Sequence, residues 1–477
     1  MSGSALCEIF DALESRELRT ARLWLESRAF NRRDEPVRLF DYLATCRAGH
    51  RPPEWDAANQ AVFNDAGKDL ARLRHTMSEL SNLLRDFLVW QEMQRESGQK
   101  ELLLLRAMRK RGLEKNFQLA GKEAEKALLT PGQRAFDRHL TTFRIQMEAF
   151  EWNLRVSRDQ HFSFDDLRSN LDAWYAGQLL HLACMEQSRQ AIRGQEKKEA
   201  EAPDSLEALL ELLPGQPQTA MPGVALYHLG QRMLARPDDS GHMEAFRLLL
   251  GQHIDTVART EARDLLMLAI NHGIRRINAG NREALRQTLE FYMLGLEKKL
   301  LHDERGVLSK YTYNNVLMSL LALQEWDRAA ALLERYRDEL PAAERDNIYR
   351  YNLSIYRFRR GDYDGTLELL REVSFADPMY NLESRKMLLK IYYEQDAFDA
   401  LDALVENLLN WLRRHGELGY HREMYRNLAR FTRQLLRLAP GNTEERKRLE
   451  TKILDTPLVA ERGWLLEKVR GNWKLGN

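Results

Sequence analysis

Cysteine, proline and glycine are all scarce in this sequence. Its 477 residues include three cysteines, 13 prolines and 26 glycines. Cys7, Cys46 and Cys184 form no Cys-x-x-Cys pair, which argues against a cysteine-based zinc site or a disulfide scaffold and indicates reduced thiols. Few helix-breaking residues, in a chain rich in Leu, Ala, Glu and Arg, favour an all-helical fold.

Neither sign of charge dominates the chain, and long apolar runs are missing. The sequence has 72 Lys and Arg against 71 Asp and Glu, a formal net charge of +1, so the total charge does not indicate a large field for polyanions. No stretch reaches the roughly 18 apolar residues that a membrane-spanning helix needs, and the first residues lack a signal-peptide pattern. We therefore expect a soluble, cytoplasmic protein with no membrane partner.

Recognisable catalytic motifs are also missing. The sequence has no phosphate loop, no Gly-x-Gly-x-x-Gly after a strand, no Gly-x-Ser-x-Gly and no His-Glu-x-x-His. Acid pairs such as Asp165-Asp166 and Asp238-Asp239 are expected to cap helices rather than transfer protons. Cys184 lies in an apolar stretch typical of a buried, unreactive thiol. The sequence thus predicts a protein that is not an enzyme, with no catalytic, cofactor or metal site.

Residues 1–160 predict an N-terminal helical bundle. Short helices are expected over residues 1–65, and three long helices follow, the second over residues 100–129. The first and third long helices carry apolar heptad seams: Leu70, Leu73, Met77, Leu80, Leu84 and Phe87, then Phe136, Leu140, Phe143, Met147, Phe150 and Leu154. Such seams predict antiparallel packing within one chain; an intermolecular coiled coil is the alternative.

From residue 225 onward a helix-turn-helix pattern recurs. Five second helices align on a small residue, at separations of 39, 45, 37 and 34 positions: Ala245, Ala284, Ala329, Thr366 and Ala400. A small side chain at a fixed place lets the two helices of a pair cross closely. A period near 34 with this feature is typical of tetratricopeptide-type repeats.

Individual segments carry the resemblance further. Residues 361–378, GDYDGTLELLREVSFADP, resemble the second half of a tetratricopeptide repeat (TPR), and YHLG at 227–230 and YNLS at 351–354 resemble its first-helix pattern. Thr366 replaces the usual Ala, and Arg357 stands where an aromatic residue is expected, so the resemblance is to a degenerate array. It implies a TPR-like α-solenoid over residues 161–477, a right-handed superhelix of helical hairpins whose concave face binds a protein or peptide.

The beginning of the chain carries a second resemblance. Residues 23–43, LWLESRAFNRRDEPVRLFDYL, resemble the opening segment of a group of uncharacterised bacterial TPR-like proteins, with Ala29 in place of a proline. Residues 77–92 resemble the helix that follows in that group. This likeness implies no activity.

One helix near the end of the sequence carries an arginine stripe. At 100° per residue its members fall within an arc of about 80°, and apolar residues occupy the opposite face. The arginine stripe comprises Arg422, Arg426, Arg430, Arg433 and Arg437. Guanidinium groups bind phosphates and carboxylates, so the stripe is a candidate surface for nucleic acid or an acidic partner; the alternative is pairing with acids of a neighbouring helix. Residues 105–115 form a second basic cluster.

Aromatic residues recur through the repeats, and Tyr356 and Tyr392 are candidates to line the concave face, with a place in the core as the alternative. Taken together, these patterns predict a non-catalytic scaffold or adaptor that binds another protein or a peptide. Nucleic-acid binding through the arginine stripe is one alternative function, and an enzyme whose site matches no recognised motif is the other.

Overall fold

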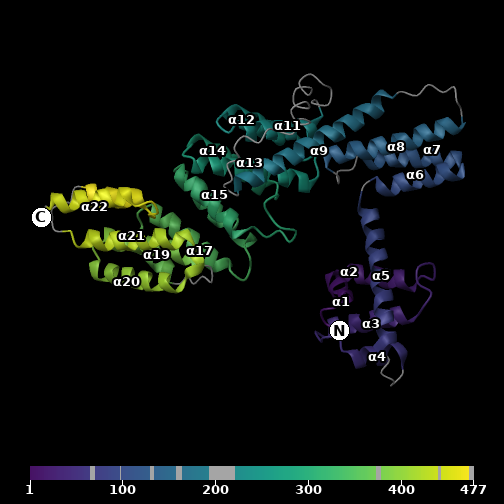
Figure 1. The fold of residues 1–477 in the computed structure, drawn as a ribbon, viewed down its shortest axis with the longest axis horizontal. Coiled ribbons are helices and arrows are strands. Elements are labelled where there is room, and N and C mark those ends of the chain that lie inside the picture. The colour runs from purple at the N-terminus through teal and green to yellow at the C-terminus, as the bar shows by residue number, and fades with distance from the viewer. Residues whose placement is uncertain are drawn as a thin grey trace. The chain divides into compact units, whose positions relative to one another are not determined.

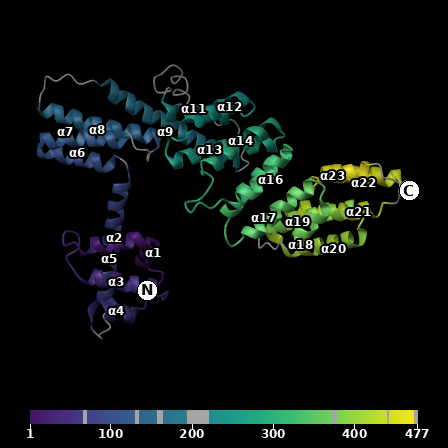
Figure 2. The same ribbon diagram turned by 180° about the vertical axis from the view of Figure 1, so that it is seen from behind.

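The computed structural model is all-helical over the residues that it describes (Figures 1 and 2). Those residues are 1–64, 70–96, 98–128, 134–156, 164–192, 221–371, 378–438 and 442–471. Helices that follow one another in the sequence pack against each other in pairs. The all-α prediction is therefore confirmed. The chain divides into two compact units, Met1–Leu268 and Ala269–Asn477.

Short helices open the first unit, as expected. They are α1 (Ala5–Ala12), α2 (Ser15–Glu26), α3 (Glu35–Ala48) and α4 (Trp55–Phe63), and the long helix α5 (Leu70–Arg95) follows. The predicted α5 seam is fully or nearly buried from Leu73 to Phe87, whereas Leu70 is 39% exposed. The seam packs on Phe10, Phe40 and other apolar residues of α1–α4. The expectation that α5 joins the later long helices in one bundle is therefore wrong.

The second long helix predicted from the sequence is two helices. Gly112 has a φ of +67°, a conformation that glycine adopts without strain, and it ends α6 (Gln99–Arg111) before α7 (Glu114–Leu128) begins. Both helices pack on α8 (Ala135–Val156), where Trp152 stacks on Phe117 with ring centroids 4.5 Å apart. The helix ends here because Gly112 adopts the left-handed conformation, which lets the chain turn so that α7 packs back on α6.

Helix α8 is covered by α6 and α7 and also by α9 (Asp165–Ile192). Its buried residues therefore include Ile145, Glu148 and Trp152, which lie outside the predicted seam. Of the seam itself, Phe136 is buried and most of the other members are half-buried. Helix α9 packs on α8 and also on α11 (Pro222–Ala235). The helices on either side of residue 160 thus belong to one unit, and the division after Leu268 lies further along the chain than the expected domain boundary at residues 160 and 161.

Further helix pairs follow. Helix α12 (Ser240–His253) packs on α11, and α13 (Arg259–Asn278) precedes α14 (Glu283–Glu297). The second unit then contains α15 (Lys310–Ala322), α16 (Trp326–Arg335), α17 (Arg345–Arg359), α18 (Tyr363–Arg371), α19 (Pro378–Glu394), α20 (Phe398–Arg414), α21 (Tyr420–Leu436), α22 (Thr443–Asp455) and α23 (Arg462–Arg470). The pairs α15–α16, α17–α18 and α19–α20 each consist of a first and a second helix in contact.

Three of the five aligned small residues lie where a close helix crossing requires them. Ala284, Ala329 and Thr366 are fully buried. Ala245 is only half-buried and Ala400 is exposed, so these two assignments are wrong. The fully buried neighbours are bulky residues one position later, Phe246 and Leu401.

The α11–α12 crossing shows how a bulky residue fits at this place. Gly230, on the first helix, supplies the space: a Cβ at Gly230 would lie 3.4 Å from the Phe246 ring and 3.1 Å from Leu268. A contact of that kind requires a small residue on only one of the two helices, and here the first helix carries it.

We expect Ala284→Trp to lower the free energy of unfolding by about 1–3 kcal/mol, because the indole ring overpacks a fully buried site. Ala400→Trp is the matched control, since Ala400 is exposed, and it should stay within about 0.5 kcal/mol of the wild type. Urea denaturation followed by circular dichroism measures both. Equal losses in the two variants would show that the register is wrong at Ala284 also.

A carboxyl group is buried in the first unit. Glu261, in the first turn of α13, is 0% exposed, and its Oε2 atom accepts a hydrogen bond of 2.7 Å from the backbone N–H of Ala135 at the start of α8. Its Oε1 atom has no hydrogen-bond partner among the described residues. Burial raises the pKa of Glu261 to about 7, although the Ala135 N–H and Arg134 oppose the rise.

This burial predicts a pH dependence. The pKa of Glu261 lies above its ordinary value of 4.5, so the wild type loses stability as the pH rises from about 4.5 to 7. Glu261→Gln removes that loss, and the variant should be more stable by about 3 kcal/mol above pH 7 and gain little at pH 4.5. Unfolding curves across this range measure the difference, and Glu123→Gln, at an exposed position of α7, is the control. A constant difference at every pH would contradict the prediction.

Candidate functional site

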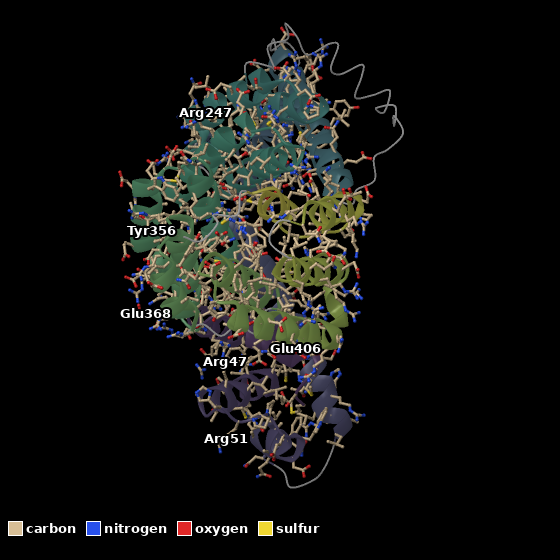
Figure 3. All side chains as sticks on the ribbon, turned by 90° about the vertical axis from the view of Figure 1, so that its left-hand side faces the viewer. Arg47, Arg51, Arg247, Tyr356, Glu368 and Glu406 are labelled. Atoms are coloured by element: carbon tan, nitrogen blue, oxygen red, sulfur yellow. The ribbon has the colours of Figure 1, made fainter. Side chains whose placement is uncertain are left out.

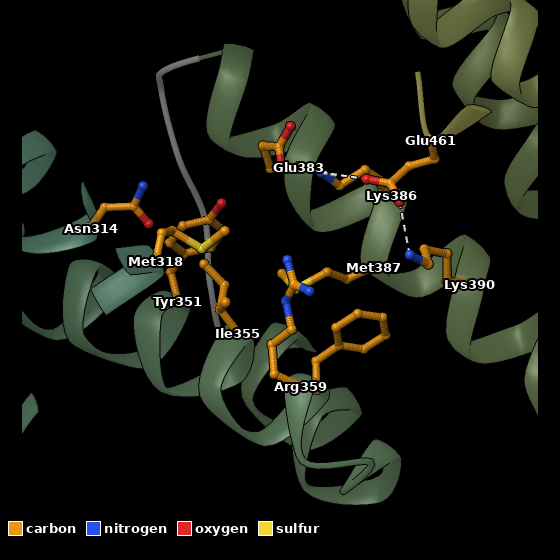
Figure 4. Close-up of a pocket in the computed structure, with 11 residues that line it drawn as sticks. Asn314, Met318, Tyr351, Ile355, Arg359, Glu383, Lys386, Met387, Lys390 and Glu461 are labelled. Carbon is orange, nitrogen blue, oxygen red and sulfur yellow. Dashed lines mark hydrogen bonds and ion pairs between the residues drawn. The ribbon is translucent and has the colours of Figure 1, made fainter. Parts of the chain in front are cut away.

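Three consecutive first helices of the second unit line one hollow (Figure 4). Its volume is about 180 Å³, below the roughly 300–1,000 Å³ of sites that enclose a drug-sized ligand. The lining residues are Asn314 and Met318 from α15, Tyr351, Ile355, Phe358 and Arg359 from α17, Glu383, Lys386, Met387 and Lys390 from α19, and Glu461 from the link before α23. The hollow has room for a side chain rather than for a whole cofactor.

Aromatic contacts between α17 and α19 bound the hollow at its two ends. The rings of Tyr351 and Tyr380 meet edge to face with centroids 4.8 Å apart. About two turns further along α17 and nearly three turns further along α19, the Lys390 ammonium lies 5.6 Å from the centroid of Phe358. Between these contacts the apolar side chains are Ile355 and Met387, both almost fully buried. Methionine adapts its shape to what packs on it, so this floor suits an apolar ligand group.

A network of ion pairs forms one wall. Lys386 and Lys390 lie one turn apart on α19, and both reach the carboxylate of Glu461, at 3.2 and 2.8 Å. Lys386 also pairs with Glu383 at 2.5 Å, and the Tyr425 hydroxyl of α21 donates a hydrogen bond to Glu383. Residues from α19, α21 and the link before α23 therefore share one network.

The charges in this network are stable near neutral pH. Burial alone would lower the pKa of Lys386, but the carboxylates of Glu383 and Glu461 outweigh it and raise that pKa. Burial alone would raise the pKa of Glu461, but the two lysines outweigh it and lower that pKa. The shifts keep both partners ionised, so these groups are suited to holding charge and not to exchanging protons near pH 7.

Arg359 gives the hollow an excess of positive charge. Its guanidinium reaches between Ile355 and Met387 (Figure 4), and no described acid forms an ion pair with it. The lining thus holds three cationic side chains, those of Arg359, Lys386 and Lys390, against the two carboxylates of Glu383 and Glu461. The amide of Asn314 adds an enclosed Oδ1 atom that has no hydrogen-bond partner among the described residues.

The arginine stripe lies on α21 and its C-terminal boundary, and it is partly satisfied within the chain. Arg422 donates to the backbone oxygen of Leu412 at 2.8 Å, Arg426 pairs with Glu423, and Arg433 pairs with Asp402 of α20 at 3.2 Å. The two other members, Arg430 and Arg437, are exposed. The opposite, apolar face is buried at Leu428, Phe431 and Leu435, as the periodicity predicts.

The second basic cluster has partners too. Arg106 and Arg109 both bind the buried carboxylate of Glu148, each at 2.6 Å, and Arg109 also pairs with Glu151 at 2.7 Å. These contacts join α6 to α8. Two arginines of the cluster, Arg106 and Arg109, therefore stabilise the interface between α6 and α8 by ion pairing.

The two candidate tyrosines lie outside the hollow. Tyr356, marked in Figure 3, contacts Trp326 at the start of α16 with ring centroids 6.4 Å apart, and its hydroxyl accepts a hydrogen bond from Arg360. Tyr392 packs against the apolar core formed by α19–α23. Sequence patterns selected these aromatic residues and missed Arg359, Lys386 and Lys390, although the two lysines have the i, i+4 spacing of one helix face.

Other residues considered from the sequence have structural roles. Cys184 is 2% exposed, which confirms its predicted burial, and burial raises its pKa to about 12, which disfavours the reactive thiolate form. Asp239 caps α12 by accepting a hydrogen bond from the backbone N–H of Gly241. Among the described residues, no group of three or more His, Cys, Asp and Glu side chains could hold a metal ion, and no helix is long and apolar enough to cross a membrane.

Comparisons with known proteins add no relative. No protein-family model matches the chain, and neither the curated proteins nor the solved structures contain a match to it. The resemblance to tetratricopeptide repeats therefore stays a prediction that rests on the residues quoted for it.

Lys386 should be the most sensitive charge of the hollow. We expect Lys386→Met to lower the free energy of unfolding at pH 7 by about 2–3 kcal/mol, because two partly buried carboxylates lose their shared cation. The two lysines hold the pKa of Glu461 below its ordinary value of 4.5, so the stability that this carboxylate gains from them is lost as the pH falls through the lowered pKa. The deficit should therefore begin to narrow toward pH 4.

A double-mutant cycle with Glu461→Gln isolates the pair, since Lys386→Met/Glu461→Gln should lose less than the sum of the two single changes. Urea denaturation at both pH values gives the four free energies. Strict additivity would show that the two residues do not stabilise each other.

Proposed function

We propose that the second unit is a TPR-like peptide-binding module and that the chain works as a non-catalytic scaffold or adaptor. The observation that carries this proposal is the hollow, because its lining comes from the first helices of three consecutive pairs, α15, α17 and α19. A surface of that kind runs across the pairs and meets a bound chain with several helices in turn.

The dimensions fit an extended peptide. Packed helices lie about 8–10 Å apart, and an extended chain advances about 3.3 Å per residue, so roughly every third peptide residue meets the next first helix. The hollow between α17 and α19 then receives one side chain, and the neighbouring residues cross α15 on one side. The apolar floor and charged wall would select the side chain by type.

The pairing of the arginine stripe weakens the nucleic-acid alternative. Phosphate contacts supply most of the affinity for nucleic acids, and Arg422, Arg426 and Arg433 would have to leave their partners in the chain to make them.

A peptide library displayed on phage, selected on the immobilised full chain, tests the proposal. We expect enriched peptides to bind the wild type with micromolar dissociation constants in fluorescence anisotropy. Asn314→Trp, which fills the hollow from α15, should weaken them at least tenfold.

Glu368→Lys is the control, because Glu368 is exposed on the second helix α18 (Figure 3), and it should change nothing. The proposal fails if selected peptides bind Asn314→Trp as tightly as the wild type while thermal melts show both proteins folded.

A further inference from the structure

The wall of the hollow contains a carboxylate delivered from a distant part of the chain. Glu461 lies 71 positions after Lys390, yet its two oxygens bind Lys390 and Lys386 at 2.8 and 3.2 Å. The Lys390 ammonium is flanked by two rings as well, Phe358 at 5.6 Å and Trp464 at 5.7 Å. The position is thus fully equipped to hold a carboxylate: two cations on one helix face, with aromatic groups beside them.

The backbone at Glu461 is held in an unusual conformation. Its φ is +53°, in the left-handed region that residues with a Cβ seldom occupy. The link is fastened to α21 on the N-terminal side of Glu461: the backbone N–H of Ala460 donates to the oxygen of Met424 at 3.2 Å, and Asn427 donates to the oxygen of Leu458 at 2.8 Å. The following residues Trp464 and Leu465 are buried in α23.

These contacts fix the main chain and aim the side chain at α19. The side chain of Glu461 retains 26% exposure, so it has a route to solvent by rotation alone. A carboxylate that can leave while its backbone stays in place is an exchangeable occupant of the lysine pair.

We propose that Glu461 is an internal ligand of the hollow, and that the partner is a peptide segment with an acidic side chain next to an aliphatic one. The acidic side chain takes the place of Glu461 on Lys390 and meets Arg359, and the aliphatic one packs on Met318, Ile355 and Met387. This inference rests on the peptide-binding function proposed above and adds the chemistry of the partner.

Charge balance favours an acidic partner over a neutral or basic one. With Glu461 in place, Arg359 still lacks an anion among the described residues, so the hollow attracts a further carboxylate. When Glu461 rotates out, Lys386 keeps Glu383 at 2.5 Å, and the incoming carboxylate restores the charge of Lys390. The exchange therefore leaves no buried cation without a counter-charge, which would be costly.

The test uses two probes and the full chain. One probe is a fluorescein-labelled dodecapeptide of alternating Glu and Leu with an amidated C-terminus; the other has Gln in place of every Glu. Fluorescence anisotropy gives the dissociation constants. We expect the wild type to prefer the Glu probe, and Glu461→Gln to bind it about tenfold more tightly because the internal competitor is gone.

Matched variants separate this effect from folding and from overall charge. Glu461→Asn removes the same charge with a residue that tolerates a positive φ, and it should gain affinity as Glu461→Gln does. Glu467→Gln makes the same charge change on α23 at a side chain that is 70% exposed, and it should leave affinity unchanged. Arg359→Gln should weaken the Glu probe about tenfold.

The outcomes distinguish the two proposals. Unchanged or weaker binding of the Glu probe in both Glu461 variants, with thermal melts showing folded protein, overturns the internal-ligand inference. Equal affinity for the Gln and Glu probes, or no binding of either, overturns the acidic partner, and the peptide-binding function then stands or falls with the library selection and the Asn314→Trp comparison.

Discussion

Close approach at the helix crossings is the constraint on which the rest of this structure depends. Gly273 on α13 faces Thr288 of α14 so tightly that a Cβ at Gly273 would overlap its side chain. At the α17–α18 crossing Thr366 is fully buried, and its hydroxyl lies 3.5 Å from the backbone oxygen of Ser354 on α17, so a larger side chain would have no room there. Close packing of this kind fixes the two helices of a pair relative to each other. The side chains on the outer face of the first helix then have fixed positions relative to one another.

The hollow follows from where those first helices do not touch. Between α17 and α19, large rings meet at one end and a lysine lies by a ring at the other, so these contacts set the separation of the two helices. Shorter or more flexible side chains, Ile355 and Met387, lie between them and cannot close the gap. The ion pairs of Lys386 and Lys390 with Glu461 then link α19 to the residues before α23 without filling the gap.

Local features of the fold were predictable because their causes are local. The buried stretch of the α5 seam and the Asp239 cap depend on residues within a few turns. The predicted register failed at Ala400 because the alignment searched for a small residue. Helix α20 begins at Phe398, and the residue that it buries three positions later is the bulky Leu401. The α5 partners were missed because an apolar seam specifies that a helix is buried and not by what.

The candidate site could not be predicted from the sequence because its residues meet only through the packing of distant segments. The i, i+4 spacing of Lys386 and Lys390 is visible, but such pairs usually face solvent, and the acid that binds them lies 71 positions away. Glu461 follows an irregular link and belongs to no periodic pattern, so nothing near it indicates α19 as its partner. The same holds for Arg433 and Asp402, which meet only because α20 and α21 pack together.

An internal ligand connects stability with binding in one residue. Two lysines facing a partly enclosed hollow need a counter-charge when no partner is bound, since an uncompensated charge away from water is costly. Glu461 supplies this counter-charge and thereby stabilises the unit when no partner is bound. A partner must displace Glu461 in order to bind. A change that frees the lysine pair should therefore strengthen binding and weaken the fold together, which is the trade-off common to sites that keep strained or unsatisfied groups for function.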